Sequence, residues 1–469
     1  MSTHPEHTRY ALRPGVTCLT VPGGAVLLNP PHKQQLKGLD AAQSQALKTL
    51  NRGPSTVADM TGDGETATVA TLLDRLAGEG WLTVTVRDGD RDLYTLRPFA
   101  TPPARPAEVA DVGSAGSAGR PAGSTAVLSK FAVIHRDSDG IVLEHPTSWC
   151  DLRIHDPRLL ALAGGANPSE LGLPEAVSSQ LSADLLWGGF AVADPAAEDA
   201  TFTTRSWSAP DLWFHRRSTL GARTVTWDHF GPTKWAKQIF PAPPARRTSH
   251  PGAPITLPQP DLATLRTEDP TLTAVLEDRR SHRAFDDANP ITLAQLAELL
   301  YRTARTRSVE TTPDGEELPS RPYPSGGSVH ELELYPVVRH VEGLSPGMYH
   351  YDSFDHTLNL VAPADSPAVQ RLLKTTSATL AEAAEPQLAL LISARAGRVM
   401  WGYEQVAYAN ILKHVGVLMQ TVYLAATAMN LGAVAQGFSD TAAFTAATGV
   451  NELEECNVGC MIIGTPATR

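Results

Sequence analysis

Two stretches poor in large apolar side chains divide this chain of 469 residues. Residues 101–125 are dominated by Pro, Ala, Gly and Ser, a composition that cannot bury enough apolar surface to form a packed core. Residues 240–260 hold seven prolines, which favour an extended spacer. The predicted organisation is a first domain at 1–100, a flexible linker at 101–125, a second domain at 126–225, a Pro-rich connector at 226–268 and a third domain at 269–469.

The first domain has the sequence pattern of hairpin, helix, helix and hairpin. A Pro-Gly-Gly turn separates two strand-like segments at 17–21 and 25–28. Asp40 is the expected N-cap of a helix that ends at Leu50. A second helix is predicted at 66–77, followed by strands at 81–86 and 93–96. Two helices followed by a two-stranded wing are typical of a winged-helix domain.

The second domain repeats this order in degenerate form. A hairpin is predicted at 131–143, and helices at 159–163 and 175–186. The segment 188–192 resembles 78–82, which indicates an internal repeat.

Winged-helix domains often read DNA, but the composition argues against that role here. The two helices of the first domain carry one basic residue each, Lys48 and Arg75, and the chain has a net charge of −11. We therefore favour peptide binding, in which an exposed sheet edge accepts an extra strand. A purely structural role and nucleic-acid binding are the alternatives.

The overall composition, with 42% hydrophobic and 19% charged residues, is that of a globular protein. Four scattered cysteines, Cys18, Cys150, Cys456 and Cys460, lack zinc-site spacing and predict free thiols in a reducing compartment. The N-terminus has no signal-peptide pattern, and no uninterrupted apolar run reaches the ~18 residues that span a bilayer. We expect a cytoplasmic protein with no metal site and no membrane association.

The third domain opens with a cluster of basic and hydroxyl side chains. Arg279, Arg280 and Arg283 surround Ser281, and guanidinium forks suit a phosphate dianion. The alternative is a solvated charge run balanced by nearby aspartates. Further along, Pro324, Ser325 and Gly326 begin a Ser-Gly-Gly turn that lets backbone amides approach a flat ligand. A plain turn before a strand is the alternative there.

A long helix follows at 404–430. Its apolar residues recur at spacings of three and four, which predicts one buried seam. The segment 433–438 comes next, and a buried strand at 458–466 closes the chain. Each of these segments alone is more typical of a core than of a site.

Taken together and in this order, these segments resemble the nitroreductase-like FMN oxidoreductases, and within them the SagB-type dehydrogenases that include ThcOx-like enzymes. The resemblance covers 269–469 and extends to 209–218, which looks like the helical lead-in of the SagB type. The two winged-helix-like domains resemble the peptide-clamp domains of ThcOx-like enzymes. The resemblance implies an α+β fold with a mostly antiparallel sheet. It also implies a homodimer that binds FMN at its interface, with 404–430 as an interface helix.

The resemblance also implies roles for individual residues. Arg279, Arg280, Ser281 and Arg283 would hold the FMN phosphate and ribityl chain. Pro324, Ser325 and Gly326 would contact the isoalloxazine ring. Gln436 and Gly437 would offer backbone amides to the ring edge, and Arg469 would assist with the phosphate.

One position departs from the pattern of azoline-oxidising relatives, which carry adjacent Lys and Tyr before the long helix. This chain reads Gly402-Tyr403, and glycine can supply neither a base nor a cation. Tyr403, Asn410 and His414 lie near one helical face. Tyr403 and His414 are therefore the candidate catalytic residues; the alternative for His414 is a helix-face histidine without a chemical role.

The implied function is oxidation of thiazoline or oxazoline to thiazole or oxazole in a ribosomally synthesised peptide. The expected partners are a precursor peptide and a cyclodehydratase, with no nucleic acid and no membrane. Two alternatives remain open. One is an FMN-dependent NAD(P)H reductase acting on a peptide or natural-product intermediate. The other is a non-catalytic flavin-fold scaffold that recruits a precursor peptide.

Overall fold

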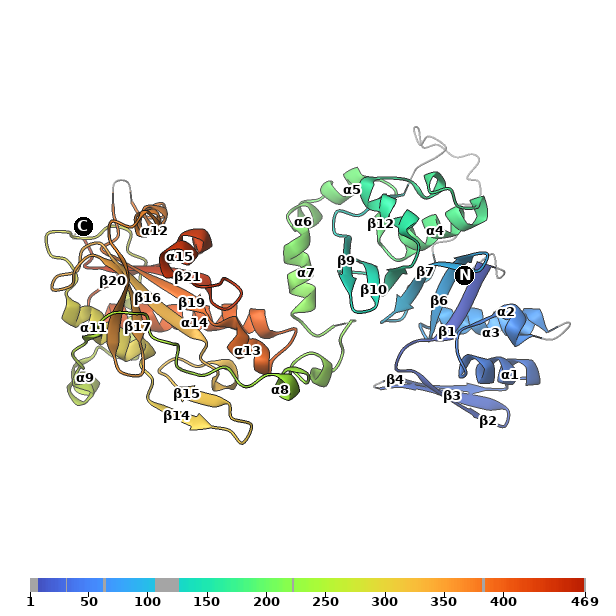
Figure 1. Cartoon of the computed structure of the whole chain (residues 1–469), viewed down its shortest axis with the longest axis horizontal. Helices are drawn as coiled ribbons and strands as arrows, with labels where there is room; N and C mark the ends of the chain where they lie inside the picture. Colours follow the sequence, from blue (N-terminus) through green and yellow to red (C-terminus); the bar gives the residue numbers. More distant parts are fainter. Residues whose placement is uncertain are drawn as a thin grey trace. The chain divides into compact units, whose positions relative to one another are not determined.

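A computed structural model describes residues 7–30, 32–61, 65–105, 126–221, 223–381 and 384–467, apart from the side chain of residue 238. The chain forms two compact units, Met1–Thr226 and Trp227–Arg469 (Figure 1). Each unit mixes helices with antiparallel sheets, so the α+β class expected from the sequence is confirmed.

The first unit begins with the elements predicted for the first domain. A three-stranded meander of β2, β3 and β4 lies beside the helices α1, α2 and α3. The predicted hairpin is confirmed as the β2–β3 pair, and Asp40 caps α1 by accepting from the Gln43 amide at 2.7 Å. The bounds are β1 (Thr8–Leu12), β2 (Thr17–Val21), β3 (Gly24–Asn29), β4 (His32–Lys37), α1 (Ala41–Leu50), β5 (Ser55–Thr56), α2 (Val57–Met60), α3 (Thr66–Gly78), β6 (Leu82–Asp88) and β7 (Arg91–Pro98).

A seven-stranded antiparallel sheet joins the two predicted N-terminal domains. Its order is β5-β1-β6-β7-β11-β10-β9, and the β7–β11 pair connects one half of the sequence to the other. The bounds of the later elements are β8 (Val127–Leu128), β9 (Val133–Asp137), β10 (Gly140–Glu144), β11 (Cys150–Ile154), η2 (Pro157–Gly164), η3 (Pro168–Glu170), α4 (Glu175–Trp187), β12 (Ala191–Val192), α5 (Pro195–Asp199), α6 (Phe202–Arg205) and α7 (Ala209–Arg217).

The second half of this unit differs from a repeat of the first. The predicted hairpin at 131–143 is confirmed as β9–β10, but the helix expected at 159–163 is the 3-10 helix η2, which ends at Gly165 in the left-handed region. After α4 the chain makes the two-residue strand β12, which pairs with β8. In the described part of the chain, no two-stranded wing follows α4, so the similarity of 188–192 to 78–82 does not extend to a second wing.

The second unit is a helix–sheet–helix sandwich. Its central sheet has the order β13-β18-β17-β16-β19-β21-β20, and every pairing is antiparallel. Because neighbouring strand residues face opposite sides, Leu334 of β16 packs with α11 and α14, whereas Tyr335 packs with α12 and α15. The bounds are η4 (Trp227–His229), α8 (Ala236–Ile239), β13 (Ile255–Thr256), α9 (Leu262–Glu268), α10 (Leu272–Asp278), α11 (Leu293–Ala304), β14 (Ser308–Thr311), β15 (Glu317–Ser320), η5 (Gly326–Ser328), β16 (Leu332–Val338), β17 (Gly347–Asp352), β18 (Thr357–Pro363), α12 (Pro367–Ser377), β19 (Leu388–Ala394), α13 (Ala396–Gly402), α14 (Ala407–Ala428), β20 (Gly432–Gln436), α15 (Thr441–Thr448) and β21 (Cys456–Gly464).

The long helix predicted at 404–430 is α14. Its seam residues Ile411, Val415, Leu418 and Val422 are buried in the core against the sheet. By length and composition alone, α14 is the one described helix that could cross a membrane. The prediction from the sequence concerned an uninterrupted apolar run, and α14 is not one, because Asn410, Lys413, His414 and Gln420 interrupt it. The burial of the seam is that of a core helix.

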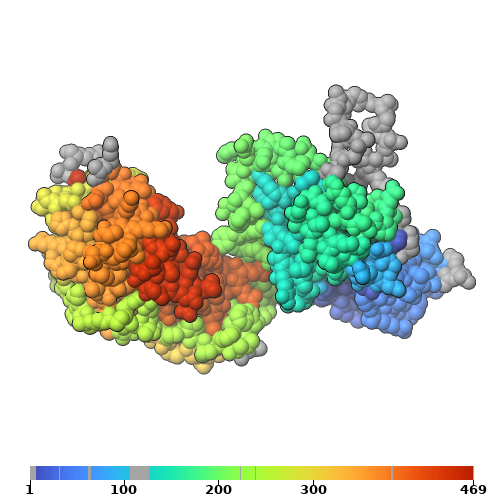
Figure 2. Space-filling model, turned by 45° about the horizontal axis from the view of Figure 1, so that its top comes forward, coloured from blue at the N-terminus to red at the C-terminus, as the bar shows by residue number. Residues whose placement is uncertain are grey.

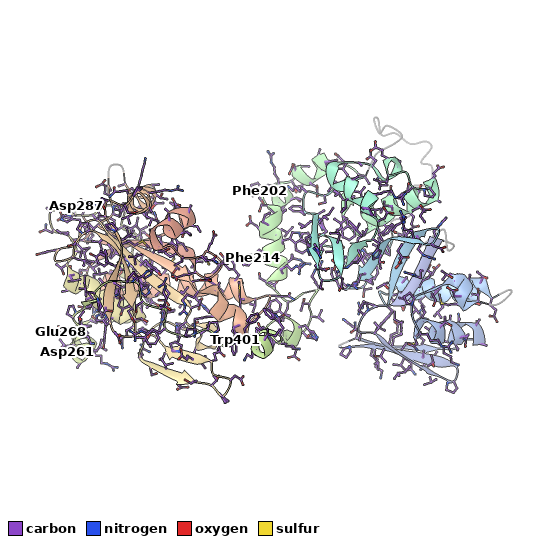
Figure 3. All side chains as sticks on the ribbon, viewed as in Figure 1. Phe202, Phe214, Asp261, Glu268, Asp287 and Trp401 are labelled. Atoms are coloured by element: carbon purple, nitrogen blue, oxygen red, sulfur yellow. The ribbon has the colours of Figure 1, made fainter. Side chains whose placement is uncertain are left out.

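The Pro-rich connector is attached to the surface of the second unit. In Figure 2 its yellow-green segment follows the lower edge of that unit. Trp401 of α13, which is labelled in Figure 3, donates its indole N–H to the Phe240 carbonyl at 3.0 Å. Arg395 binds the carbonyls of Pro244 and Ala245 at 2.8 and 2.9 Å. The connector has little regular structure, as its prolines predict, but these bonds give it a defined path.

Gly464, at the end of β21, is closely packed against Gln387 and Phe285. A Cβ at this position would lie 2.6 Å from Gln387 Oε1 and 2.8 Å from the Phe285 ring. The Gln387 carbonyl already accepts from two backbone amides and is poorly placed to move. Gly464→Ala should therefore lower the free energy of unfolding by about 1–3 kcal/mol, as measured by urea titration.

Gly397 in α13 is the matched control, because a Cβ there would meet nothing within 4 Å. Gly397→Ala should be neutral or slightly stabilising. Equal stability of the two variants would contradict the packing described for Gly464.

Candidate functional site

The Ser-Gly-Gly turn has an unusual backbone conformation. Gly327, Ser328 and His330 have φ values of 62°, 53° and 47°. Non-glycine residues in this region cost on the order of 1–3 kcal/mol each and persist only where surrounding contacts hold them. The contacts that hold this turn therefore identify the residues on which its shape depends.

His414 of α14 is the first of these contacts. The Gly326 amide donates to His414 Nε2 at 2.7 Å, and His414 Nδ1 donates to Glu331 Oε1 at 2.8 Å. This pattern requires the neutral tautomer with its proton on Nδ1. Both ring nitrogens are engaged, so in this arrangement the histidine positions the turn; action as a base would require it to release one bond.

Two further contacts complete the support of the turn. Ser325 Oγ accepts from the His330 amide at 3.1 Å. The Arg398 guanidinium, 3% exposed, donates twice to the Val329 carbonyl, at 2.8 and 3.1 Å, and also to the carbonyls of Glu317 and Pro243. Burial lowers the pKa of Arg398 to about 10. This role of Arg398 could not be predicted from the sequence, because Arg398 is far from the turn along the chain.

Tyr403 lies on the other side of the turn. It caps α13, and its hydroxyl would be 2.8 Å from a Cβ at position 327, so only glycine fits there. A Cβ at Gly326 would be 3.2 Å from His414 Nε2 and 3.8 Å from Asn410 Nδ2. The structure thus brings Tyr403, Asn410 and His414 to the turn.

The arginine-rich segment lies near the other end of α14. Ser281 pairs with Ala433 of β20, and its hydroxyl makes a 3.1 Å hydrogen bond with the Tyr423 hydroxyl. The Arg279 guanidinium is 5.4 Å from the centre of the Tyr423 ring. Tyr423 Oη also accepts from the Ala435 amide at 2.7 Å. Tyr423 was not among the predicted site residues, although its aromatic hydroxyl next to the apolar seam residue Val422 was a signal.

The remaining predicted residues have different surroundings. Arg280 and Arg283 are exposed. The Gln436 side chain is buried and donates to Thr376 O and Thr379 Oγ1, both at 2.7 Å, so it fixes α12 to β20. Gly437 is exposed. Arg469 lies outside the described residues.

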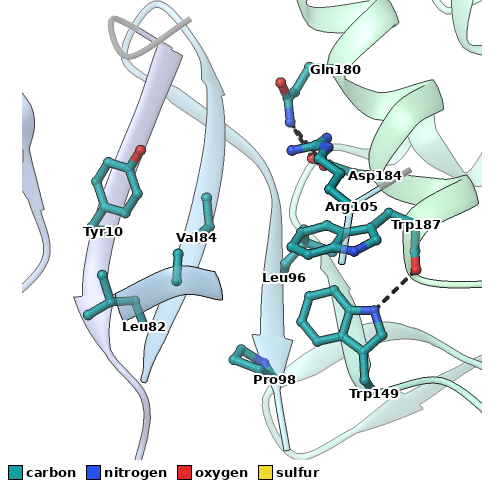
Figure 4. Close-up of a pocket in the computed structure, with 11 residues that line it drawn as sticks. Tyr10, Leu82, Val84, Leu96, Pro98, Arg105, Trp149, Gln180, Asp184 and Trp187 are labelled. Atoms are coloured by element: carbon teal, nitrogen blue, oxygen red, sulfur yellow. Dashed lines mark hydrogen bonds and ion pairs between the residues drawn. The ribbon is translucent and has the colours of Figure 1, made fainter. Parts of the chain in front are cut away.

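The first unit contains a small pocket beneath the rings of Trp149 and Trp187, which lie 4.4 Å apart (Figure 4). Asp184, buried beside it, accepts hydrogen bonds from Arg105 at 2.6 Å and Gln180 at 2.9 Å. These contacts anchor residues 101–105, the start of the predicted linker, to α4. The rest of that linker, 106–125, lies outside the described residues.

Burial lowers the pKa of His330 to about 3, with Arg321 as the next contributor. The folded protein therefore resists protonation of His330, whereas the unfolded chain binds a proton below about pH 6.5. Folding stability should fall as the pH drops below that value. Between pH 6.5 and 5, protonation of His330 in the unfolded chain should lower the free energy of unfolding by about 2 kcal/mol.

His330→Asn should remove that part of the acid sensitivity, since asparagine tolerates the left-handed backbone and does not titrate. The free energy of unfolding at pH 7 and pH 5 measures the effect. His340→Asn, at an exposed position, is the control and should behave as the unmodified protein. Identical pH dependence in all three proteins would contradict the burial of His330.

Two segments of the chain match known protein families. Residues 276–465 match the Nitroreductase family, and residues 126–224 match the family described as cyanobactin oxidase ThcOx. A protein of Methanocaldococcus jannaschii described as a nitroreductase is 29% identical over 178 residues, covering 38% of this chain and 81% of that protein.

Solved structures give similar matches. A nitroreductase of Ralstonia eutropha JMP134 is 25% identical, covering 51% of this chain and 99% of its own, with a TM-score of 0.36. The E. coli microcin synthetase McbBCD complex, with truncated pro-MccB17 bound, has a chain 17% identical over 45% of this chain and 82% of its own, with a TM-score of 0.34. A nitroreductase of Desulfovibrio desulfuricans in complex with FMN is 15% identical over 43% of this chain and 88% of its own, with a TM-score of 0.27.

The assignment rests on the two family matches, which fall in different units of the structure. Relatives in the nitroreductase family bind FMN. Residues 276–465 form an oxidoreductase domain of the nitroreductase family, and the same chain carries, ahead of it, a domain of the cyanobactin oxidase ThcOx family.

Proposed function

We propose that this protein is an FMN-dependent dehydrogenase that oxidises thiazoline or oxazoline rings to thiazoles or oxazoles in a ribosomally synthesised peptide. The observation that carries the proposal is the presence of a nitroreductase-family domain and a ThcOx-family domain on one chain. The second domain sets this chain apart from a nitroreductase that consists of the catalytic domain alone.

The residues present fit FMN. Arg279 and Ser281 supply a guanidinium and a hydroxyl at one end of α14, which suit a phosphate and a ribityl chain. The turn at Gly326 and Gly327 lies at the other end, where a side chain at position 327 would collide with Tyr403. His414 contacts the turn and Tyr423 contacts the arginine-rich segment, and these two residues of α14 are about 13 Å apart along the helix axis. FMN, when bound, supplies the two-electron acceptor for ring oxidation.

The chain's own residues hold the reacting groups in place. His414 and Arg398 fix the two ends of the turn, so its amides keep one orientation. The Tyr403 hydroxyl, beside Gly327, is placed to donate a hydrogen bond to a substrate lying over the turn. Such fixed donors stabilise developing charge without having to reorganise during the reaction.

The first unit offers a surface for the peptide. β4 pairs with β3 and with no other described strand, so one edge is free to accept an added strand. Beside it lies a cleft of about 530 Å³ whose lining includes Arg13, His32, Gln34, Trp81 and Phe99. The order of α1, α2, α3, β6 and β7 is that of a winged helix, and we assign it the role of a peptide clamp for the precursor.

The second unit is proposed to form a homodimer through α14 and α10. Tyr408, Leu412 and Val417 of α14 are 41%, 40% and 36% exposed, and Leu272 and Leu276 of α10 are 66% and 46% exposed. These apolar side chains lie on two helices that contact each other. A second copy would remove them from water, as oligomer interfaces do.

The alternative proposal is an FMN-dependent NAD(P)H reductase. It is favoured by Gly402, where azoline-oxidising relatives carry lysine. A cyclodehydratase partner remains part of the main proposal, since it would form the azoline that this enzyme oxidises. A protein that neither contains nor takes up FMN would instead support the non-catalytic scaffold.

FMN binding should depend on Arg279. The purified protein should show absorbance bands near ~370 and ~450 nm and release FMN on denaturation. Arg279→Gln should weaken FMN binding about tenfold or more and leave riboflavin binding nearly unchanged, because riboflavin lacks the phosphate. Arg266→Gln, at an exposed position of α9, is the control. Equal losses for both flavins would exclude a phosphate role for Arg279.

The direction of electron flow has a direct test. A thiazoline-bearing precursor peptide, incubated with the FMN-loaded protein in air, should lose about 2 Da per ring as the flavin accepts two electrons. Mass spectrometry measures the change, and the intact precursor should react at lower concentration than a core peptide lacking its leader. Consumption of NAD(P)H with no azole formed would favour the reductase.

A further inference from the structure

The reaction proposed above requires a proton acceptor near the turn, and most titratable groups there cannot serve. Both nitrogens of His414 are hydrogen-bonded. Glu331 is fully buried and bound to His414. His330 is 4% exposed and packs edge-on against Tyr323. The Tyr403 hydroxyl, beside Gly327, is already assigned to donate a hydrogen bond to the substrate.

Glu316 is a carboxylate in a loop next to this group of residues. It lies in the turn between β14 and β15, and β15 contacts the Ser-Gly-Gly turn η5. If a Cβ is built on Gly402, Glu316 Oε1 lies 3.9 Å from it. The carboxylate therefore lies beside the residue that directly precedes Tyr403, and the glycine places no side chain between them.

The position of Glu316 is fixed by its own turn. Its amide donates to Thr312 Oγ1 at 3.1 Å, and its carbonyl accepts from the Thr312 amide at 2.9 Å. The side chain is half-buried, and its carboxylate has no hydrogen bond or ion pair with any described residue, so its lone pairs are available. The Arg398 guanidinium, which holds the turn, is close enough to interact with it electrostatically.

We propose that Glu316 is the catalytic base of ring oxidation, an inference that rests on the proposed function. The Glu316 carboxylate takes the proton from the ring α-carbon and becomes a carboxylic acid. The electrons of that C–H bond form the new carbon–carbon double bond as the β-carbon loses a hydride. FMN, when bound, would be the oxidant that takes up this hydride, and dioxygen would be the terminal electron acceptor.

The test compares Glu316→Gln with Glu310→Gln in the FMN-loaded full chain. Glu310 lies on β14 of the same hairpin and is exposed. Glu316→Gln should slow azole formation by about 10²-fold or more, with the FMN spectrum, FMN affinity and peptide affinity unchanged. Glu310→Gln should match the unmodified protein. Formate should partly restore the rate of Glu316→Ala, because it supplies a free carboxylate in the vacated space.

The outcomes separate this inference from the proposed function. An active unmodified protein together with an active Glu316→Gln overturns the assignment of the base and leaves the function standing. Loss of FMN or peptide affinity in Glu316→Gln, without rescue by formate in Glu316→Ala, shows a structural role and also overturns the assignment. An FMN-loaded unmodified protein that forms no azole overturns the function, and the assignment with it.

Discussion

The packing of α14 against the central sheet is the interaction on which the candidate site depends. Ile411, Val415, Leu418 and Val422 bury one seam of the helix in the core of the second unit. That burial fixes the rotation of the helix about its axis. It thereby directs His414 to the Ser-Gly-Gly turn and Tyr423 to the arginine-rich segment. The helix α14 thus holds the Ser-Gly-Gly turn and the arginine-rich segment, which are distant in sequence, at a fixed separation.

The turn itself shows how buried polar groups can maintain a strained backbone. Glu331 and Arg398 are buried, and burying charges is costly unless their polar atoms are satisfied. Here the His414 imidazole satisfies one Glu331 oxygen, and backbone carbonyls satisfy Arg398. The bonds that offset this cost also hold Ser328 and His330 at positive φ. The stability of the network and the shape of the turn are therefore coupled.

Local features of the fold could be predicted from the sequence. The Pro-Gly-Gly hairpin, the Asp40 cap and the seam of α14 follow from turn chemistry, capping and helical periodicity, which act over a few residues. The β7–β11 pairing was not predictable in this way, because it joins strands from two blocks that each appeared complete. The path of the connector was also missed, since backbone carbonyls that accept from Arg395 and Arg398 leave no sequence signature.

The same distinction applies to the candidate site. The arginine cluster, the turn and Tyr403 were identified by residue type and order. The residues that hold these segments in position have ordinary local sequences and come from distant parts of the chain. They are Tyr423, Glu331 and Arg398. The role predicted for Gln436 involves its backbone amide; the hydrogen bond from its side chain to the Thr376 carbonyl, in α12, was not predicted. Long-range contacts, rather than motifs, decide what each side chain can do.

We propose that α14 supports a flavin site that extends from the Ser-Gly-Gly turn to the arginine-rich segment. A crystal structure of the FMN-loaded protein would locate the flavin. We expect the isoalloxazine ring against Gly326 and Gly327, with the His414–Gly326 bond intact, and the phosphate within hydrogen-bonding distance of Arg279. A ring bound elsewhere, or a turn that has lost its bond to His414, would contradict it.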